Sequence, residues 1–278
     1  LTPEYNQVRD LVRGWMEEAG LKTRVDAVGN LFGRKQGGVK GLPVVMAGSH
    51  LDSQNPGGRF DGPAGVLTAL EAVRRIAEVD ALHDHPLEVV AFVGEESACG
   101  VVTFGSSILA GQLGAGEMKR AVHPPTGKSV WEAIRLSGGR PERFKSCKLS
   151  KKNLKAFLEL HIEQGPILET AKVPIGIVDT VVGALRGDIF FEGQTAHSGG
   201  QPMLYRRDAA MAAAAFMVDV GDNGFAIDFK ASVGAMDYLN VNGRSGSHVS
   251  LVAVTLRSNL ECSGGEVIEG SLDPPGGP

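Results

Sequence analysis

The stretch Leu42-Pro43-Val44-Val45-Met46-Ala47, which runs directly into Gly48-Ser49-His50, decides the fold. A continuous apolar run of this kind predicts a strand that is buried on both faces of a sheet. Helices are expected before and after it along the chain. The first starts at Thr2-Pro3, and its apolar positions have helical spacing: Val8, Leu11, Val12, Trp15 and Met16. The second follows a glycine-rich loop, with apolar positions at Val66, Leu70, Val73, Ile76 and Ala77.

Two further apolar runs also end in ionisable residues. Segment 87–93 is followed by Gly94 and the pair Glu95-Glu96, and segment 154–160 is followed by His161. In open α/β sheets, ligands bind outside the carboxyl ends of the strands. The sequence therefore predicts that His50, Glu95, Glu96 and His161 lie along one rim of an α/β sheet.

The second half of the chain has a different pattern. Segment 183–191 alternates like a strand, segment 208–220 is an alanine-rich helix, and segments 225–239 and 249–256 are strand-like. This β-α-β-β order predicts a second, smaller α+β domain. We divide the chain into residues 1–177, residues 178–260 and an irregular tail over residues 261–278.

The composition excludes several classes of protein. The chain has 278 residues, 38 glycines and a net charge of −4, and this glycine content is about twice the average share. The weak negative charge and the lack of a long basic run argue against nucleic acid or an anionic membrane as a partner. Three scattered cysteines argue against a disulfide framework. With no apolar run long enough to cross a bilayer, we expect a soluble, cytoplasmic protein.

Metal-assisted hydrolysis is the chemistry that the residues of the rim suggest. His50, His161 and Asp61 are imidazole and carboxylate ligands, which suit Zn²⁺ and also Mn²⁺, Co²⁺ or Ni²⁺. Asp61 lies in a loop stiffened by glycines, and its carboxylate can bridge two divalent ions. Adjacent glutamates on extended backbone point in opposite directions. One of Glu95 and Glu96 can therefore bind metal while the other takes a proton from activated water.

The carboxylate of Asp52, two residues after His50, is expected to accept the second imidazole N–H of that histidine and to fix its tautomer. Each of these residue types taken alone is more often structural, so the prediction depends on their combination. Neither a GxxxxGK[ST] phosphate loop nor a GxSxG nucleophile motif is present. We expect Cys99 to be a buried, inert thiol. Four histidines are expected to be loop residues without a role in the site: His83, His85, His123 and His248.

The motifs in combination resemble those of the hydantoinase/carbamoylase amidase family, within the di-metal aminoacylase/carboxypeptidase superfamily. That family includes N-carbamoyl-L-amino-acid hydrolases, allantoate and ureidoglycolate amidohydrolases, and β-ureidopropionases. The matching blocks occur in the family's order: Gly48–Ser53, Gly57–Gly62, Glu95–Ser97, Glu159–Pro166, Ala196–Gly199 and Arg206–Ala209.

The resemblance implies a role for each matching residue. His50 and His161 would hold one metal and Glu96 the other, with Asp61 bridging the two ions. Glu95 would be the general base, and Asp52 would support His50. The substrate would be contacted by Gln164, Asn242 and Arg257, and its carbonyl would be polarised by His197 from the partner subunit.

The resemblance also implies an architecture. Residues 1–177 would form part of an α/β/α di-metal catalytic domain, and residues 178–260 an inserted, ferredoxin-like domain that acts as a lid and dimerises. The family's catalytic domain is completed by a C-terminal segment with a further metal-ligating histidine, which we do not find in the sequence.

The expected function is hydrolysis of a linear ureido or amide bond with two divalent ions per subunit, and an N-carbamoyl-L-amino acid or an allantoate-like compound as substrate. Two alternatives stay open at this point. One is a dipeptidase or aminoacylase of the same superfamily, and the other is a truncated, non-catalytic relative that binds metal or dimerises.

Overall fold

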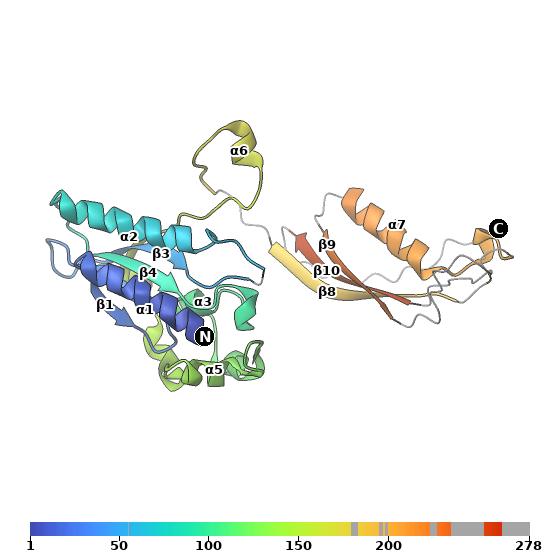
Figure 1. Ribbon diagram of the computed structural model, residues 1–278, viewed down its shortest axis with the longest axis horizontal. Helices are drawn as coiled ribbons and strands as arrows, with labels where there is room; N and C mark the ends of the chain where they lie inside the picture. Colours follow the sequence, from blue (N-terminus) through green and yellow to red (C-terminus); the bar gives the residue numbers. More distant parts are fainter. Residues whose placement is uncertain are drawn as a thin grey trace. The chain divides into compact units, whose positions relative to one another are not determined.

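The computed structural model describes residues 1–54, 56–178, 183–194, 197, 200–222, 227–234 and 253–262. The chain divides into two compact units, Leu1–Pro174 and Ile175–Pro278, which are treated separately below. Figure 1 shows the elements of both units. None of the described helices is both long enough and apolar enough to span a bilayer.

A five-stranded mixed sheet forms the centre of the first unit. Its strands lie in the order β1 (Lys22–Val25), β2 (Leu31–Lys35), β4 (Leu87–Phe92), β3 (Val44–His50) and β7 (Leu154–Leu158). Strand β3 is parallel to both β4 and β7, so the carboxyl ends of these three strands share one edge, as the sequence predicts. The sequence contains no apolar pattern that predicts β1, because Lys-Thr-Arg-Val forms a polar, largely exposed strand at the edge of the sheet.

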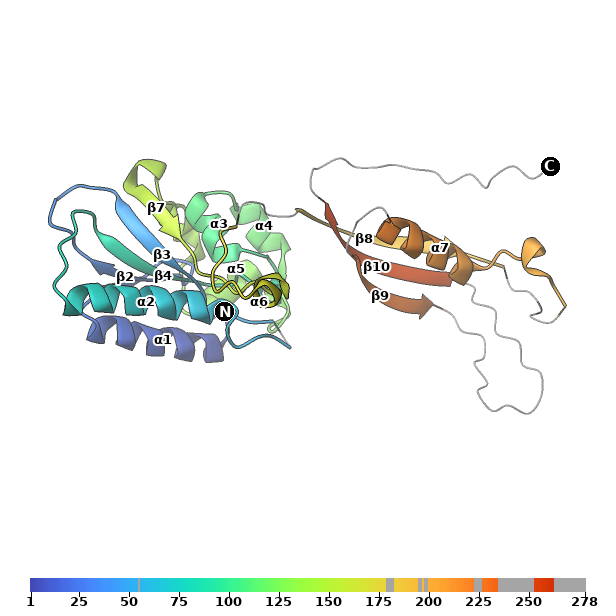
Figure 2. The same ribbon diagram turned by 90° about the horizontal axis from the view of Figure 1, so that it is seen from above.

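Two long helices cover one face of this sheet, as Figure 2 shows. Helix α1 (Pro3–Glu18) begins where the Thr2 side chain accepts a hydrogen bond from the backbone N–H of Tyr5. Helix α2 (Pro63–Glu78) follows the glycine-rich loop. Both helices share one buried cluster with strand residues such as Val89. The predicted apolar face of α1 is partly wrong, because three of its five residues are exposed: Val8, Leu11 and Trp15.

The opposite face of the sheet carries a smaller apolar cluster. It consists of Phe32, Val44, Met46, Val90 and Phe92, packed against Leu109, Leu149 and Leu154. The expected α/β character is therefore present, although the long helices of this unit lie on one face only among the described residues.

Short elements connect β4 to β7. They are η1 (Ser97–Cys99), α3 (Phe104–Ala110), α4 (Ala115–Arg120), β5 (Val122–His123), β6 (Lys128–Ser129), α5 (Val130–Leu136), η2 (Pro141–Cys147) and η3 (Lys151–Asn153). His123 is not the loop residue that we expected, since it is buried and pairs with Lys128 across β5 and β6. Cys99 is buried as expected, and burial raises the pKa of its thiol to about 11. Helix α6 (Ile167–Ala171) follows β7.

The second unit contains a three-stranded antiparallel sheet in the order β8 (Gly183–Glu192), β10 (Ala253–Cys262) and β9 (Ile227–Gly234). Between β8 and β9 the chain forms η4 (Met203–Tyr205) and α7 (Ala209–Asp222). Ala209 and Ala213 of α7 pack near Phe191 of β8. The predicted β-α-β-β order is confirmed. Residues 261 and 262, assigned above to the tail, belong to β10, and residues 263–278 lie outside the described residues.

Candidate metal centre

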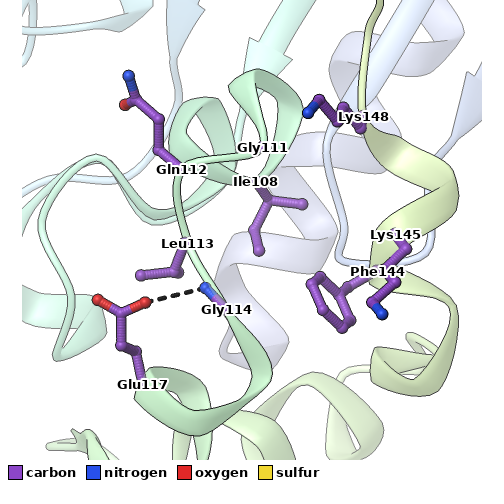
Figure 3. Close-up of a pocket in the computed structure, with 9 residues that line it drawn as sticks. All are labelled: Ile108, Gly111, Gln112, Leu113, Gly114, Glu117, Phe144, Lys145 and Lys148. Atoms are coloured by element: carbon purple, nitrogen blue, oxygen red, sulfur yellow. Dashed lines mark hydrogen bonds between the residues drawn. The ribbon is translucent and has the colours of Figure 1, made fainter.

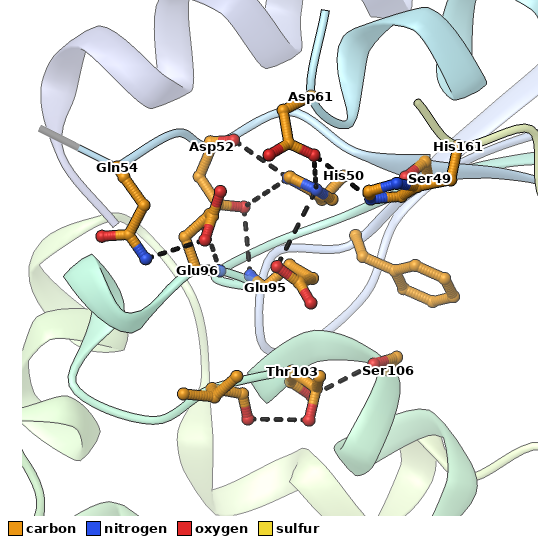
Figure 4. Close-up of polar contacts among 12 residues, drawn as sticks. Ser49, His50, Asp52, Gln54, Asp61, Glu95, Glu96, Thr103, Ser106 and His161 are labelled. Carbon is orange, nitrogen blue, oxygen red and sulfur yellow. Dashed lines mark hydrogen bonds and ion pairs between the residues drawn. The ribbon is translucent and has the colours of Figure 1, made fainter. Parts of the chain in front are cut away.

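The carboxyl ends of three parallel strands bring the predicted ionisable residues together (Figure 4). His50 is the last residue of β3, the Glu95-Glu96 pair follows β4, and His161 follows β7. Two groups of side chains have ligand atoms that all lie within 4.8 Å of one another. One group is His50, Asp61 and His161, and the other is His50, Glu95 and Glu96.

His50 is oriented so that one ring nitrogen points at carboxylates. Its side chain is buried, and its Nδ1 lies 2.9 Å from the backbone oxygen of Asp52. A carbonyl oxygen only accepts hydrogen bonds, so a neutral His50 ring carries its proton on Nδ1 and has its lone pair on Nε2. That Nε2 lies 3.7 Å from Oδ1 of Asp61 and 3.8 Å from Oε2 of Glu95.

His161 repeats this arrangement on the other side of Asp61. Its Nδ1 lies 2.8 Å from the backbone oxygen of Ile162, and its Nε2 lies 3.1 Å from Oδ1 of Asp61. Both histidines therefore direct an Nε2 lone pair at one carboxylate oxygen. Ligands of a tetrahedral ion with bonds of about 2.1 Å lie about 3.4 Å apart. The spacing of these three donors fits a divalent ion.

The charge of the site favours a cation as well. Four carboxylates, those of Asp52, Asp61, Glu95 and Glu96, gather around His50. Within the described part of the chain, no ion pair joins any of the four to a lysine or arginine. Divalent ions are bound by such sets of imidazole and carboxylate groups.

The two glutamates differ in their surroundings. Glu95 approaches His50, and burial raises the pKa of its carboxyl. The positive charge that His50 carries when its ring is protonated opposes this rise, and the charge of Glu96 adds to it. The Oε2 of Glu96 accepts a hydrogen bond from the side-chain amide of Gln54 at 2.8 Å. We expected the two side chains to point in opposite directions, but one oxygen of each lies within 4.8 Å of a ring nitrogen of His50. The backbone turns after β4, so these residues do not follow strand geometry.

Asp52 contacts His50 in a different way from the one expected. Its backbone oxygen, not its carboxylate, accepts the Nδ1–H, and its Oδ1 is 3.9 Å from Nδ1. The carboxylate instead accepts hydrogen bonds from the backbone N–H groups of Glu95 and Glu96, at 3.1 and 2.9 Å. These N–H groups lie just beyond the end of β4, and Asp52 satisfies them. It thereby joins the ends of β3 and β4.

The remaining predicted residues have different outcomes. Gln164, whose φ is 58°, donates a hydrogen bond from Nε2 to Oδ2 of Asp61 at 2.6 Å, so it lies at the centre of the site. His197 belongs to the second unit, and its Nδ1 accepts a hydrogen bond from the backbone N–H of Gly200. Arg257 lies in β10 opposite Asp188 and Lys230, and Asn242 lies outside the described residues.

Sequence reasoning missed three polar residues near the site. Gln54 contacts Glu96, and the buried Ser49 donates a hydrogen bond to the carboxylate of Glu159. Each is a neighbour of a predicted residue along the chain. Ser49 and Glu159 also fall inside the matching blocks of sequence, but an isolated Gln, Ser or Glu has no spacing that by itself indicates chemistry.

Gly62, the residue before α2, permits the position of His50. Its φ is 82°, and a Cβ there would lie 2.5 Å from Cε1 of the His50 ring. We predict that Gly62→Ala weakens Co²⁺ binding and lowers the free energy of unfolding. Gly20→Ala is the matched control, because Gly20 has a φ of 78° with no atom within 4 Å of the added Cβ. The control should cost only about 1–2 kcal/mol of stability. Chemical denaturation and Co²⁺ titration measure both effects, and equal losses in the two variants would contradict the prediction.

A cavity of about 550 Å³ lies elsewhere in the first unit (Figure 3). Its lining includes Ile108, Leu113, Phe144, Lys145 and Lys148. None of the predicted site residues lines it. Because the ligand atoms gather at the sheet edge, we place the candidate centre there and not in this cavity.

Comparisons with known proteins identify the family to which the chain is similar. A model of the family described as peptidase family M20/M25/M40 matches residues 44–253. An N-carbamoyl-L-amino acid amidohydrolase of Geobacillus stearothermophilus is 42% identical over 216 residues, which cover 77% of this chain and 52% of the relative. A ureidoglycolate hydrolase of Oryza sativa subsp. japonica is 38% identical over 211 residues, covering 75% of this chain and 44% of the relative.

Among solved structures, a hydantoinase/carbamoylase family amidase from Burkholderia ambifaria matches with a TM-score of 0.75 and 31% identity. The match covers 94% of this chain and 63% of that structure. The chain thus spans about half the length of the curated relatives that it matches.

Proposed function

Because this chain belongs to the M20/M25/M40 peptidase family and is similar to hydantoinase/carbamoylase amidases within it, we propose that it is a metal-dependent enzyme. The proposed reaction is hydrolysis of an amide bond in linear ureido compounds. The observation that carries the proposal is the pair of Nε2 atoms, from His50 and His161, that face Oδ1 of Asp61. The two curated relatives named above are hydrolases of an N-carbamoyl-L-amino acid and of ureidoglycolate.

His50, Asp61 and His161 would hold one divalent ion, and Asp61 with Glu96 would hold a second. Zn²⁺ and Mn²⁺ suit this donor set best, and Co²⁺ and Ni²⁺ are compatible with it. When bound, such ions polarise a carbonyl group and acidify water. His50 keeps its lone pair available for this purpose because the backbone oxygen of Asp52 fixes its tautomer.

Glu95 acts as the general base in this proposal. Its raised pKa brings the carboxylate closer to the proton affinity that a base needs near neutral pH. It takes a proton from the water that attacks the ureido carbonyl carbon and delivers the proton to the leaving amine. For an N-carbamoyl amino acid, the released carbamate decomposes to CO₂ and ammonia. Asp52 keeps Glu95 and Glu96 in place through their backbone N–H groups.

The second unit would contribute the groups that hold the substrate. The Nδ1 of His197 accepts a hydrogen bond from Gly200, so a neutral ring carries its proton on Nε2 and can donate it to a carbonyl oxygen. Arg257 and Asn242 would bind the substrate carboxylate. The guanidinium group of arginine presents a fork of N–H donors that fits the two oxygens of a carboxylate. Gln164 would line the substrate site. We further propose a homodimer through residues 178–260, in which His197 acts on the partner's substrate.

Ammonia release tests the proposal directly. The metal-free chain is loaded with Zn²⁺, Mn²⁺, Co²⁺ or Ni²⁺ and supplied with several N-carbamoyl-L-amino acids, ureidoglycolate, allantoate or N-carbamoyl-β-alanine. We expect turnover of at least one ureido substrate, with N-carbamoyl-L-amino acids preferred. Bound metal without turnover of any substrate would favour a non-catalytic, metal-binding relative. Cleavage of dipeptides in preference to every ureido compound would favour a peptidase.

A further inference from the structure

We propose that the hydrogen bond between Ser49 and Glu159 positions the two histidines of the metal centre relative to each other. Ser49 precedes His50, and Glu159 lies two residues before His161. The Ser49 hydroxyl donates to Oε1 of Glu159. We call these two side chains the Ser49–Glu159 clamp. The inference rests on the proposed metal centre, because it concerns how that centre is held together.

The clamp lies where the backbone pairing of the two strands stops. The last paired residues of β3 and β7 are Ala47 and Leu158. Strand β3 continues to His50, but β7 ends at Leu158. The segment that carries His161 therefore leaves the sheet before it reaches the site. Beyond this point the side-chain hydrogen bond connects Glu159, the residue after Leu158, to Ser49 of β3.

The surroundings leave Ser49 little freedom to move. Its side chain is fully buried, and a Cβ on Gly65 in the first turn of α2 would lie 2.7 Å from the Ser49 Cβ. The backbone oxygen of Leu160 lies against the same face of Gly65. Helix α2 thus packs against Ser49 and against the backbone of Leu160, the residue that follows Glu159. The Ser49 hydroxyl therefore provides a fixed donor to Oε1 of Glu159.

Metal affinity should be the property that depends on the clamp. His161 contacts Asp61 from a segment without sheet pairing, so the clamp limits how far its Nε2 can move from that of His50. Residues that orient metal ligands typically change metal affinity by about 10- to 100-fold when they are mutated. Glu159 itself is exposed, so its removal should change the affinity much more than the stability.

The experiment is a Co²⁺ titration of the metal-free 278-residue chain, followed through the visible absorption of the bound ion. We expect Glu159→Ala and Ser49→Ala each to weaken Co²⁺ binding by about 10- to 100-fold and to alter the absorption spectrum. The double variant should be no weaker than the weaker single variant, because both substitutions remove one hydrogen bond. Glu159→Gln should retain most of the affinity, since its Oε1 still accepts from Ser49.

Glu163→Ala is the matched control. Glu163 lies two residues after His161, and its carboxylate accepts from the backbone N–H groups of Ile167 and Leu168 at the start of α6. This variant should bind Co²⁺ like the parent chain. Unchanged binding in Glu159→Ala, an equal loss in Glu163→Ala, or additive losses in the double variant would each overturn the clamp while leaving the metal centre intact. A parent chain that binds no Co²⁺ would overturn the metal centre and the clamp with it.

Discussion

The Glu95→Gln variant should release ammonia about 10²- to 10⁴-fold more slowly than the parent chain while retaining its metal. Glutamine keeps the size of the side chain but cannot take a proton from water. Glu95 is also the glutamate whose carboxyl pKa is raised by burial, and it lies next to the lone pair of His50. The loss should therefore appear in kcat and leave metal binding unchanged.

Glu96→Gln provides the comparison for this prediction. Glu96 is proposed as a metal ligand, so its substitution should lower metal content together with activity. Steady-state ammonia release and elemental analysis of the purified variants distinguish the two effects. Retained turnover in Glu95→Gln would exclude it as the base. Lost metal in Glu95→Gln with retained metal in Glu96→Gln would reverse the two assignments.

The Asp61→Asn variant should lose both metal and activity. One oxygen of Asp61 lies between the Nε2 atoms of both histidines, and its other oxygen accepts a hydrogen bond from Gln164. Asparagine removes the negative charge and can place an amide N–H against the histidine lone pairs. We expect metal affinity to fall by at least about 100-fold, since loss of a ligand should exceed the effect of losing one of its supports.

Equilibrium dialysis with elemental analysis measures this loss. Asp10→Asn is a suitable control, because Asp10 is an exposed residue of α1 that pairs with Arg9. Metal binding of Asp61→Asn at the affinity of this control would remove Asp61 from the ligand set.

Much of the fold and the location of the site follow from local sequence patterns. The apolar runs that precede His50, Glu95 and His161 correspond to strands β3, β4 and β7. Parallel pairing then places their ends on one rim, which is a general property of such sheets. The ionisable residues at the carboxyl ends of the strands could therefore be predicted from the sequence.

Contacts that depend on the exact path of the backbone could not be predicted. The spacing of His50 and Asp52 indicated a contact, but not that the backbone oxygen would reach the ring while the carboxylate satisfies two N–H groups. Likewise, helical spacing identified the apolar residues of α1 but not which of them face the sheet. The Ser49–Glu159 clamp joins residues 110 positions apart, and no local pattern reports such a contact.

Metal-dependent ammonia release from an N-carbamoyl-L-amino acid is the most direct test of the central claim, that the rim of the sheet is a hydrolytic metal centre. The chain is assayed as loaded with metal, after removal of the metal with a chelator, and after metal is added back. The account predicts turnover that is lost on chelation and restored by the added ion. Turnover that persists unchanged in the metal-free chain would contradict it.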